Sequence, residues 1–184
     1  GCGDLGGRAF PPPSLRGISV ALVPGAPDLR GTWRIVRYTT RSVLGRDSRY
    51  EEAEGRAAGS GGWFKPPPPP KEILQRIEQA GNRIVITTGG DTAHRIIHDI
   101  TCDDSFEGAA DDVSGGDLTS HIRATGRYIQ DAERGAVHVL TPALNVANVS
   151  IPGITVERWR EGELMVWKYG FYRMHCERVE GGGS

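Results

Sequence analysis

Five histidines are the side chains in this sequence best suited to hold a metal ion or a haem iron. His94 and His98 are four residues apart in an apolar, β-branched stretch, so a strand would point both toward the same face. At about 3.3 Å per residue they would lie about 13 Å apart, too far to bind one ion unless His121 or His138 helped from neighbouring strands. Solvent-facing strand histidines are the simpler interpretation. We therefore predict no metal site, with His94 the first position to test.

The other reactive side chains lack the spacings that known enzyme motifs use. No serine lies in a G-x-S-x-G turn, and the chain has neither a Walker loop nor a dinucleotide fingerprint. The acidic stretch over residues 103–117 lacks the D-x-[DN]-x-[DN]-G spacing of a calcium loop, which favours a solvated loop. We predict no catalytic residues and no cofactor, although an enzyme that uses scattered residues would leave no motif.

The cysteines indicate a history of export. Gly1-Cys2-Gly3 resembles the cut junction of a bacterial lipoprotein, where a lipidated cysteine follows a small residue, and this implies a membrane tether through Cys2. The alternative is an unmodified cysteine. Cys102 and Cys176 lack zinc-ligand spacing, so they are either one disulfide closing a long loop or two buried free thiols. We expect a periplasmic, outer-membrane-anchored or extracellular protein.

The balance of charges argues against nucleic acid as a partner, and the hydropathy argues against a membrane-spanning helix. The 22 Lys and Arg residues nearly balance the 23 Asp and Glu residues, giving a net charge of −1 and no basic field for nucleic acid. No stretch approaches the roughly 20 apolar residues that a membrane-spanning helix needs.

Short β-branched and aromatic runs between turn residues predict the elements that would position these groups. The segment 71–80 also fits helical spacing, but Gly81-Asn82 and the β-branched run after it favour a hairpin. Gly170 interrupts the last run and predicts a bulge or bend. The fold class expected is all-β, an eight-stranded antiparallel up-and-down barrel. The expected strands cover residues 31–39, 73–79, 83–88, 93–100, 121–129, 136–140, 154–160 and 163–179.

Composition divides the chain into a barrel domain, an N-terminal segment, a long loop and a C-terminal tail. Residues 1–28 contain three consecutive prolines and read as a flexible or arm-like segment, and residues 29–180 form the barrel domain. Residues 41–70 form a long Gly/Pro-rich loop between the first two strands. In it Trp63 and Phe64 precede a stiff run of five prolines that would aim them at the interior or at a partner. Residues 181–184 resemble a linker tail.

The sequence Gly31-Thr32-Trp33, at the start of the first strand, resembles the G-x-W signature of the lipocalins and the wider calycin group. The resemblance covers residues 29–179. It implies that Gly31 opens the first strand, that Trp33 plugs the narrow end of the barrel, and that Arg173 or Arg178 crosses the indole. The family's second signature, a T-D-Y-like turn, and its long helix have no counterpart here.

The resemblance and the strand series together predict an extracytoplasmic lipocalin-like protein that holds a small hydrophobic ligand, such as a lipid, in its barrel. One alternative is a structural or assembly protein whose proline-rich arms contact neighbouring subunits in a homo-oligomer. Another is a haem- or metal-binding barrel or a small enzyme. The candidate ligand-lining residues are Ile35, Trp63, Phe64, Ile77, Ile84, Ile86, Ile97, Val139, Val156 and Trp167.

Overall fold

The computed structural model of the chain describes residues 13–41, 51–53, 71–89, 95–103, 119–146 and 149–179. These residues form twelve strands and contain no helix, so no helix among them has the length and apolar character needed to cross a membrane. The strands are β1 (Gly31–Thr40), β2 (Glu51–Ala53), β3 (Leu74–Ala80), β4 (Arg83–Gly89), β5 (Arg95–Thr101), β6 (Thr119–His121), β7 (Ala124–Asp131), β8 (Gly135–Val146), β9 (Val149–Pro152), β10 (Val156–Glu161), β11 (Leu164–Tyr169) and β12 (Tyr172–Arg178).

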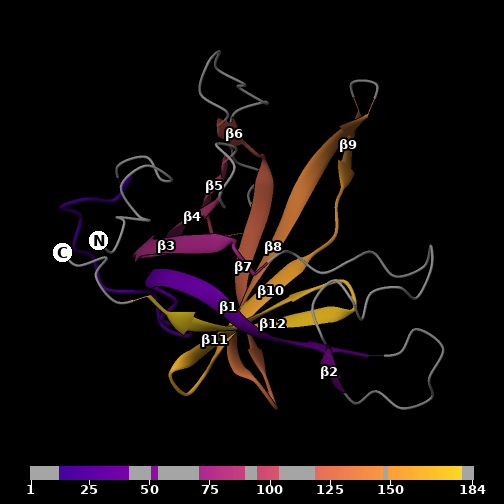
Figure 1. The fold of residues 1–184 in the computed structure, drawn as a ribbon. Helices are drawn as coiled ribbons and strands as arrows, with labels where there is room; N and C mark the ends of the chain where they lie inside the picture. Colours follow the sequence, from indigo (N-terminus) through magenta and orange to yellow (C-terminus); the bar gives the residue numbers. More distant parts are fainter. Residues whose placement is uncertain are drawn as a thin grey trace, which may run out of the picture.

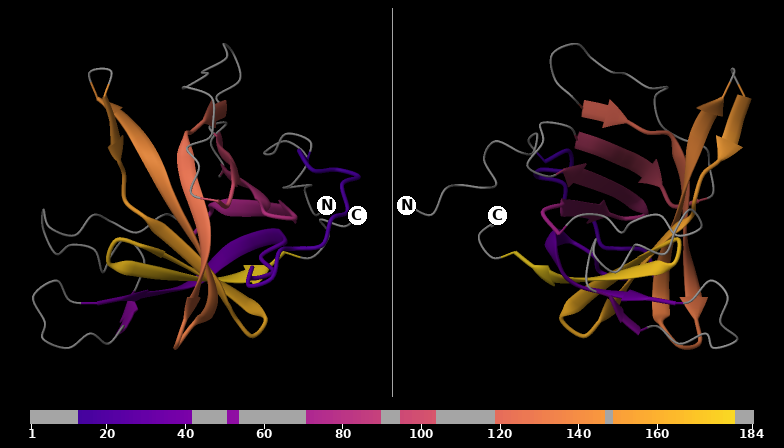
Figure 2. Two further views of the ribbon diagram at one scale, coloured as in Figure 1. Left: turned by 180° about the vertical axis from the view of Figure 1, so that it is seen from behind. Right: turned by 45° about the vertical axis from the view of Figure 1, so that its right-hand side comes forward.

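The strands curl into a nearly closed antiparallel barrel (Figures 1 and 2). Among the described residues, nine strands follow one another around the wall in the order β5-β4-β3-β1-β12-β11-β10-β8-β7, each antiparallel to the next. Short β2 pairs with the end of β1, and β9 pairs with the end of β8. The predicted all-β, up-and-down barrel is therefore confirmed. The predicted strand count of eight is wrong.

The ninth strand comes from the C-terminal run, which is two strands rather than one. Tyr169 pairs with Tyr172, which leaves Gly170 and Phe171 as a two-residue hairpin loop. Gly170 has a φ of 59°, a left-handed conformation that glycine adopts without strain. The predicted bulge at Gly170 is thus a complete reversal of the chain. The strand predicted over residues 73–79 is confirmed as β3, against its helical alternative.

An odd number of strands cannot close by antiparallel pairing alone, and the chain resolves this at the β5–β7 seam. Here β6 runs parallel to β5, and the Ile122 N–H just beyond β6 donates to the Ile97 carbonyl at 3.0 Å. Nearer the other end, Ile100 of β5 fills the space over Gly126 of β7, where a Cβ would lie only 2.4 Å from the Ile100 Cδ1. Parallel neighbours need a crossover of a dozen or more residues, and residues 102–118 supply that length.

One end of the barrel is closed by the segment that leads into β1. The Val23 N–H donates to the Gly81 carbonyl at the β3–β4 turn, and the Gly25 carbonyl accepts from Gln130 of β7 at 2.9 Å. Buried Gln79 of β3 holds the segment from within: its Oε1 accepts from the Leu29 N–H at 2.7 Å and its Nε2 donates to the Pro27 carbonyl at 3.0 Å. Residues 23–29 therefore cross this end.

Trp33 fills the closed end from the inside. Its side chain is 1% exposed, and its indole N–H donates to the Leu29 carbonyl at 2.8 Å. The guanidinium carbons of Arg178 and Arg160 lie 4.7 and 5.2 Å from the centre of the ring, within cation–π range. Of the two arginines that the resemblance offered, Arg178 is the one over Trp33. Arg173 lies 5.1 Å from the ring of Trp159 instead.

Candidate ligand site inside the barrel

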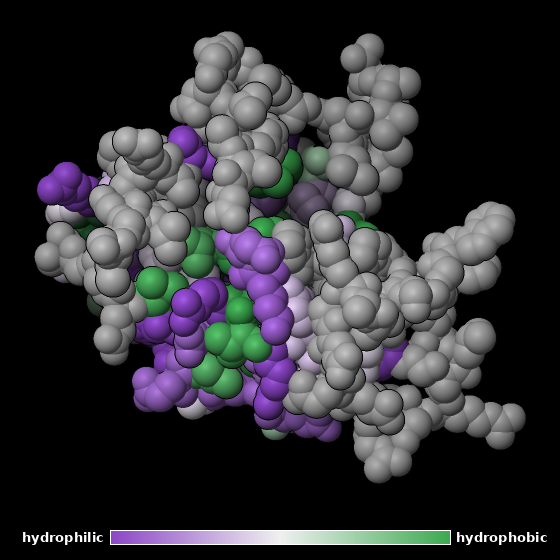
Figure 3. Space-filling view, viewed as in Figure 1, coloured by the Kyte–Doolittle hydropathy of each residue, from purple (hydrophilic) through white to green (hydrophobic). Residues whose placement is uncertain are grey.

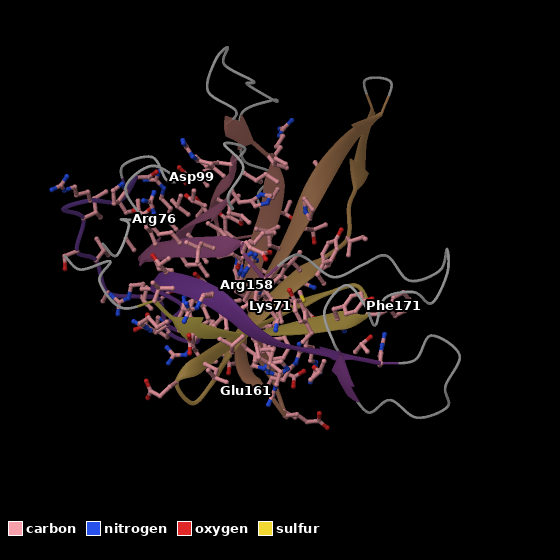
Figure 4. The ribbon with its side chains drawn as sticks, in the orientation of Figure 1. Lys71, Arg76, Asp99, Arg158, Glu161 and Phe171 are labelled. Atoms are coloured by element: carbon pink, nitrogen blue, oxygen red, sulfur yellow. The ribbon has the colours of Figure 1, made fainter. Side chains whose placement is uncertain are left out.

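A belt of inward-pointing side chains crosses the barrel wall above Trp33. Because alternate residues of a strand face opposite sides and paired residues share a side, the register identifies the members of this belt. They are Tyr128 on β7, His138 on β8, Arg158 on β10, Trp167 on β11, Met174 on β12 and Tyr38 on β1. Figure 4 labels Arg158, which belongs to this interior group.

Arg158 is a buried cation inside the barrel. Its side chain is 3% exposed, its Nε donates to the Gln75 Oε1 at 3.3 Å, and its guanidinium carbon lies 5.6 Å from the ring of Trp167. Within the described part of the chain, its buried Nη1 has no hydrogen-bond partner. Among the described residues no carboxylate contributes to its pKa, which burial lowers to about 10. Arg158 therefore remains charged at neutral pH without an ion-pair partner in that part of the chain.

Two buried imidazoles accompany the guanidinium. His138 is fully buried and is the cross-strand partner of Arg158, and no described residue forms a hydrogen bond with either of its ring nitrogens. Burial first and the Arg158 charge second lower the pKa of His138 to about 3 and that of His98 to about 4. A hydrogen bond that the His98 ring donates to the Ile122 backbone acts on the pKa of His98 in the opposite direction, and among the described residues the His98 Nδ1 has no partner. Both rings are neutral at pH 7.

Cys102 and Cys176 are not joined in a disulfide, so the structure does not support the predicted bridge. Cys102 follows β5, whereas Cys176 lies in β12, and β4, β3 and β1 separate the two around the wall. Strands are spaced about 4.8 Å apart, so this separation exceeds the Cα distance of about 7 Å that a disulfide tolerates. Burial raises the pKa of Cys176 to about 12, which keeps its thiol protonated and neutral.

These groups can bind a hydrogen-bond acceptor within an apolar enclosure. The Arg158 Nη1 donates, and the neutral His138 ring offers one N–H and one acceptor nitrogen. The ring N–H of His98 already donates to the Ile122 backbone, so its Nδ1 can only accept. The side chains around them belong to the main hydrophobic core. The described residues contain no group of three or more His, Cys, Asp or Glu side chains placed to hold a metal ion.

Most of the predicted lining residues that the structure describes belong to this interior, and Ile97 and Val139 do not. The core contains Ile35, Ile77, Ile84, Ile86, Val156 and Trp167. Ile97 instead packs with Leu15, which lies in the N-terminal segment outside the wall, and Val139 packs with Trp159 in a third cluster. Both face outward because they alternate with inward residues, His98 in β5 and His138 in β8. The assignment of these two residues to the lining is corrected.

Several predicted positions lie outside the described residues. These are Cys2, with its proposed lipid tether; Trp63 and Phe64 of the 41–70 loop; His94; and the tail 181–184. The side chain of His121 is also outside that description. The tether, the localisation, the arm-mediated assembly and the orientation of Trp63 and Phe64 therefore stay predictions. His98 is the one member of the predicted histidine pair that the structure places, and it faces inward opposite Ile86.

Arg158, Gln75 and Gln79 were not among the predicted site residues, although the alternation of side chains points to all three. Val156 was placed inside, and Arg158 is two residues further along the same strand, so it shares that face. Ile77 was likewise placed inside, and Gln75 and Gln79 are its neighbours at the same period. Reading β10 and β3 for polar residues on the apolar face would have identified the site.

A hydroxyl–imidazole contact elsewhere does not form the pair that nucleophilic catalysis needs. The Thr39 Oγ1 lies 3.0 Å from the His175 Nε2, and the Arg37 Nη2 lies 3.2 Å from the His175 Nδ1. Arginine only donates, so Nδ1 accepts and a neutral ring carries its proton on Nε2. In this arrangement His175 donates to the Thr39 hydroxyl and does not act as its base.

No protein-family model matches the chain, and no curated protein is similar enough in sequence to count as a relative. The all-strand, nearly closed antiparallel barrel is compatible with a calycin-like fold.

Proposed function

We propose that this protein is a lipocalin-like binding protein that holds a small, largely apolar molecule inside its barrel. The observation that carries the proposal is the group of unpartnered nitrogens of Arg158 and His138 within an otherwise apolar interior. A buried polar group without a partner costs about 1–3 kcal/mol, and buried groups in proteins are nearly always satisfied. A bound molecule that supplies hydrogen-bond partners accounts for both groups.

The shape of the barrel supports the same proposal. Trp33 and the crossing segment close one end, where β3 pairs with residues 31–34 of β1, and β1 runs on from there to Thr40 at the opposite end. A ligand would enter at that opposite end. Burial of its apolar surface against the core stabilises the complex by about 25 cal/mol per Å².

The outer surface does not compete with the interior as an apolar site. On the face seen in Figure 3, hydrophobic residues are bordered by hydrophilic ones. The exposed large apolar side chains among the described residues are Ile18, Val20, Val36 and Ile154, which come from separate parts of the chain apart from the first two. Scattered exposure of this kind is ordinary for a folded protein.

The test is displacement of a neutral hydrophobic dye, Nile red, by decanol and decanoate, each followed by fluorescence. Ala124→Phe places a ring on an inward position of β7, and Arg127→Phe places the same ring on the exposed face of that strand. We expect saturable binding by the native protein and by R127F, and at least tenfold weaker binding by folded A124F. Equal binding by both variants, or no saturable binding by the native protein, would refute an interior site.

A further inference from the structure

We propose that residues 18–22 dock against the same residues of a second copy of this chain, as an antiparallel strand pair centred on Val20. These five residues, the docking segment, have the sequence Ile-Ser-Val-Ala-Leu and lie on the outer surface before β1. The inference does not depend on the proposed binding inside the barrel. It is carried by a stretch of chain that is anchored at both ends and unpaired between them.

The barrel wall holds the chain on both sides of the docking segment. Before it, the backbone N–H groups of Ser14 and Leu15 donate to the Glu78 carboxylate on β3, at 3.2 and 2.9 Å. The Leu15 side chain is buried in a small cluster on the outer wall with Ala80, Val85 and Ile97. After the segment, the Val23 N–H donates to the Gly81 carbonyl at 3.2 Å. A segment fixed at both ends has less conformational entropy left to lose when it docks.

Between these anchors the docking segment is apolar, exposed and outside any sheet (Figure 1, the indigo trace that leads into β1). Ile18 is 48% exposed and Val20 is 56% exposed, the latter being the most exposed large apolar side chain among the described residues. Within the described part of the chain, the backbone of residues 19–22 forms no hydrogen bond. Proteins usually protect such stretches with charges or proline. Here no charged residue lies between Arg16 and Asp28, so the segment is left able to pair.

The order of the side chains in the docking segment is self-complementary about Val20. In an antiparallel pair centred there, Val20 lies opposite Val20 of the second copy, Ile18 opposite Leu22, and Ser19 opposite Ala21. Alternation puts the three large apolar side chains on one face of the pair and the two small ones on the other. A twofold axis through Val20 therefore matches like with like and brings no charges together, which is the arrangement that a symmetric dimer requires.

The same features argue against a lipid surface as the occupant. Insertion into hydrocarbon would leave the backbone N–H and C=O groups of residues 19–22 without partners, whereas a second strand supplies them. A contact between two five-residue strands is smaller than the roughly 1,200 Å² that a stable interface buries. We therefore expect a reversible dimer whose population grows with protein concentration.

The experiment is sedimentation velocity over about a hundredfold range of protein concentration, on native protein, Val20→Lys, Val20→Glu and a 1:1 mixture of the two variants. Native protein should dimerise reversibly. Each variant should dimerise at least tenfold more weakly, because the twofold axis sets like charges opposite each other. The mixture should recover most of that loss, because opposite charges then face each other. Ile154→Lys, at another exposed apolar position, is the control and should leave the affinity within about twofold of native.

Native protein that stays monomeric over the whole range overturns the inference. Dimerisation that is unchanged in V20K and V20E overturns it as well, because the contact then lies elsewhere. A mixture that dimerises as weakly as either variant alone refutes the twofold axis through Val20. Monomeric native protein that binds phosphatidylglycerol vesicles, with V20E failing to bind, assigns the segment to a lipid surface and also overturns the inference. Matching thermal unfolding transitions verify that the variants are folded, and none of these outcomes bears on dye binding inside the barrel.

Discussion

Replacing the buried Arg158 by methionine should stabilise the ligand-free protein, because burial of an unpaired guanidinium opposes folding. Burial lowers its pKa from 12.5 to about 10, and each pKa unit corresponds to about 1.4 kcal/mol, so the folded state disfavours the charge by on the order of 3 kcal/mol. Methionine has a similar volume and no charge. The substitution leaves the Gln75 amide without its partner, which costs about 1–2 kcal/mol. We therefore expect the unfolding free energy of R158M to exceed that of the native protein by about 1–2 kcal/mol.

The double variant R158M/Q75L removes both polar groups. Its unfolding free energy should rise by about 3 kcal/mol, which corresponds to a rise of roughly 6–12 °C in the thermal unfolding midpoint. The control is Arg160→Met in the same strand. All three guanidinium nitrogens of Arg160 donate to backbone carbonyls, those of Asp28, Gly162 and Leu164, so R160M should lose stability. Urea unfolding at pH 7, without ligand, gives the free energies. A loss of more than 1 kcal/mol in R158M/Q75L would refute the reasoning.

Three further predictions concern the stability of the fold. The low pKa values of His98 and His138 mean that the unfolded chain takes up their protons first as the pH falls below 6.5, so the unfolding free energy should drop toward pH 4. By pH 5 the unfolding free energy should fall by on the order of 2 kcal/mol for each ring. His138→Leu should remove about half of the combined drop, and equal urea midpoints at pH 7 and pH 5 would contradict this. Gln79→Leu leaves two backbone groups of the crossing segment without partners, so the unfolding free energy in urea should fall by roughly 2–4 kcal/mol. An unchanged midpoint would count against the closed end. Gly126→Ala should lower the unfolding free energy by about 1–3 kcal/mol, because the new Cβ meets the Ile100 Cδ1. Ile100→Val deletes that atom and should recover part of the loss in a double-mutant cycle. Purely additive losses would place the seam elsewhere.

The strand series was predictable because β-branched alternation and turn residues are local signals. Gly81-Asn82 marked the β3–β4 turn, and the segment 73–79 was assigned correctly despite its helical spacing. The ninth strand was missed because the run 163–179 is apolar and aromatic on both sides of Gly170. A strand of 17 residues is about three times the usual length, and that excess was the available sign of a hairpin.

The group of buried polar side chains inside the barrel was only partly predictable, because its members come from different strands. Local patterns place Val156, and by alternation Arg158, on the inner face of β10. That Gln75 reaches Arg158 across the interior depends on the closure of the barrel, which no local pattern specifies. The absence of a disulfide between Cys102 and Cys176 depends on the same closure, since it separates their strands.

The measurement that tests the account most directly is a crystal structure of the protein with decanoate. We predict one decanoate inside the barrel, with its polar end within hydrogen-bond distance of the Arg158 Nη1 or of a His138 ring nitrogen. Decanoate bound only on the outer wall, or inside with its polar end away from both groups, would contradict the proposed function.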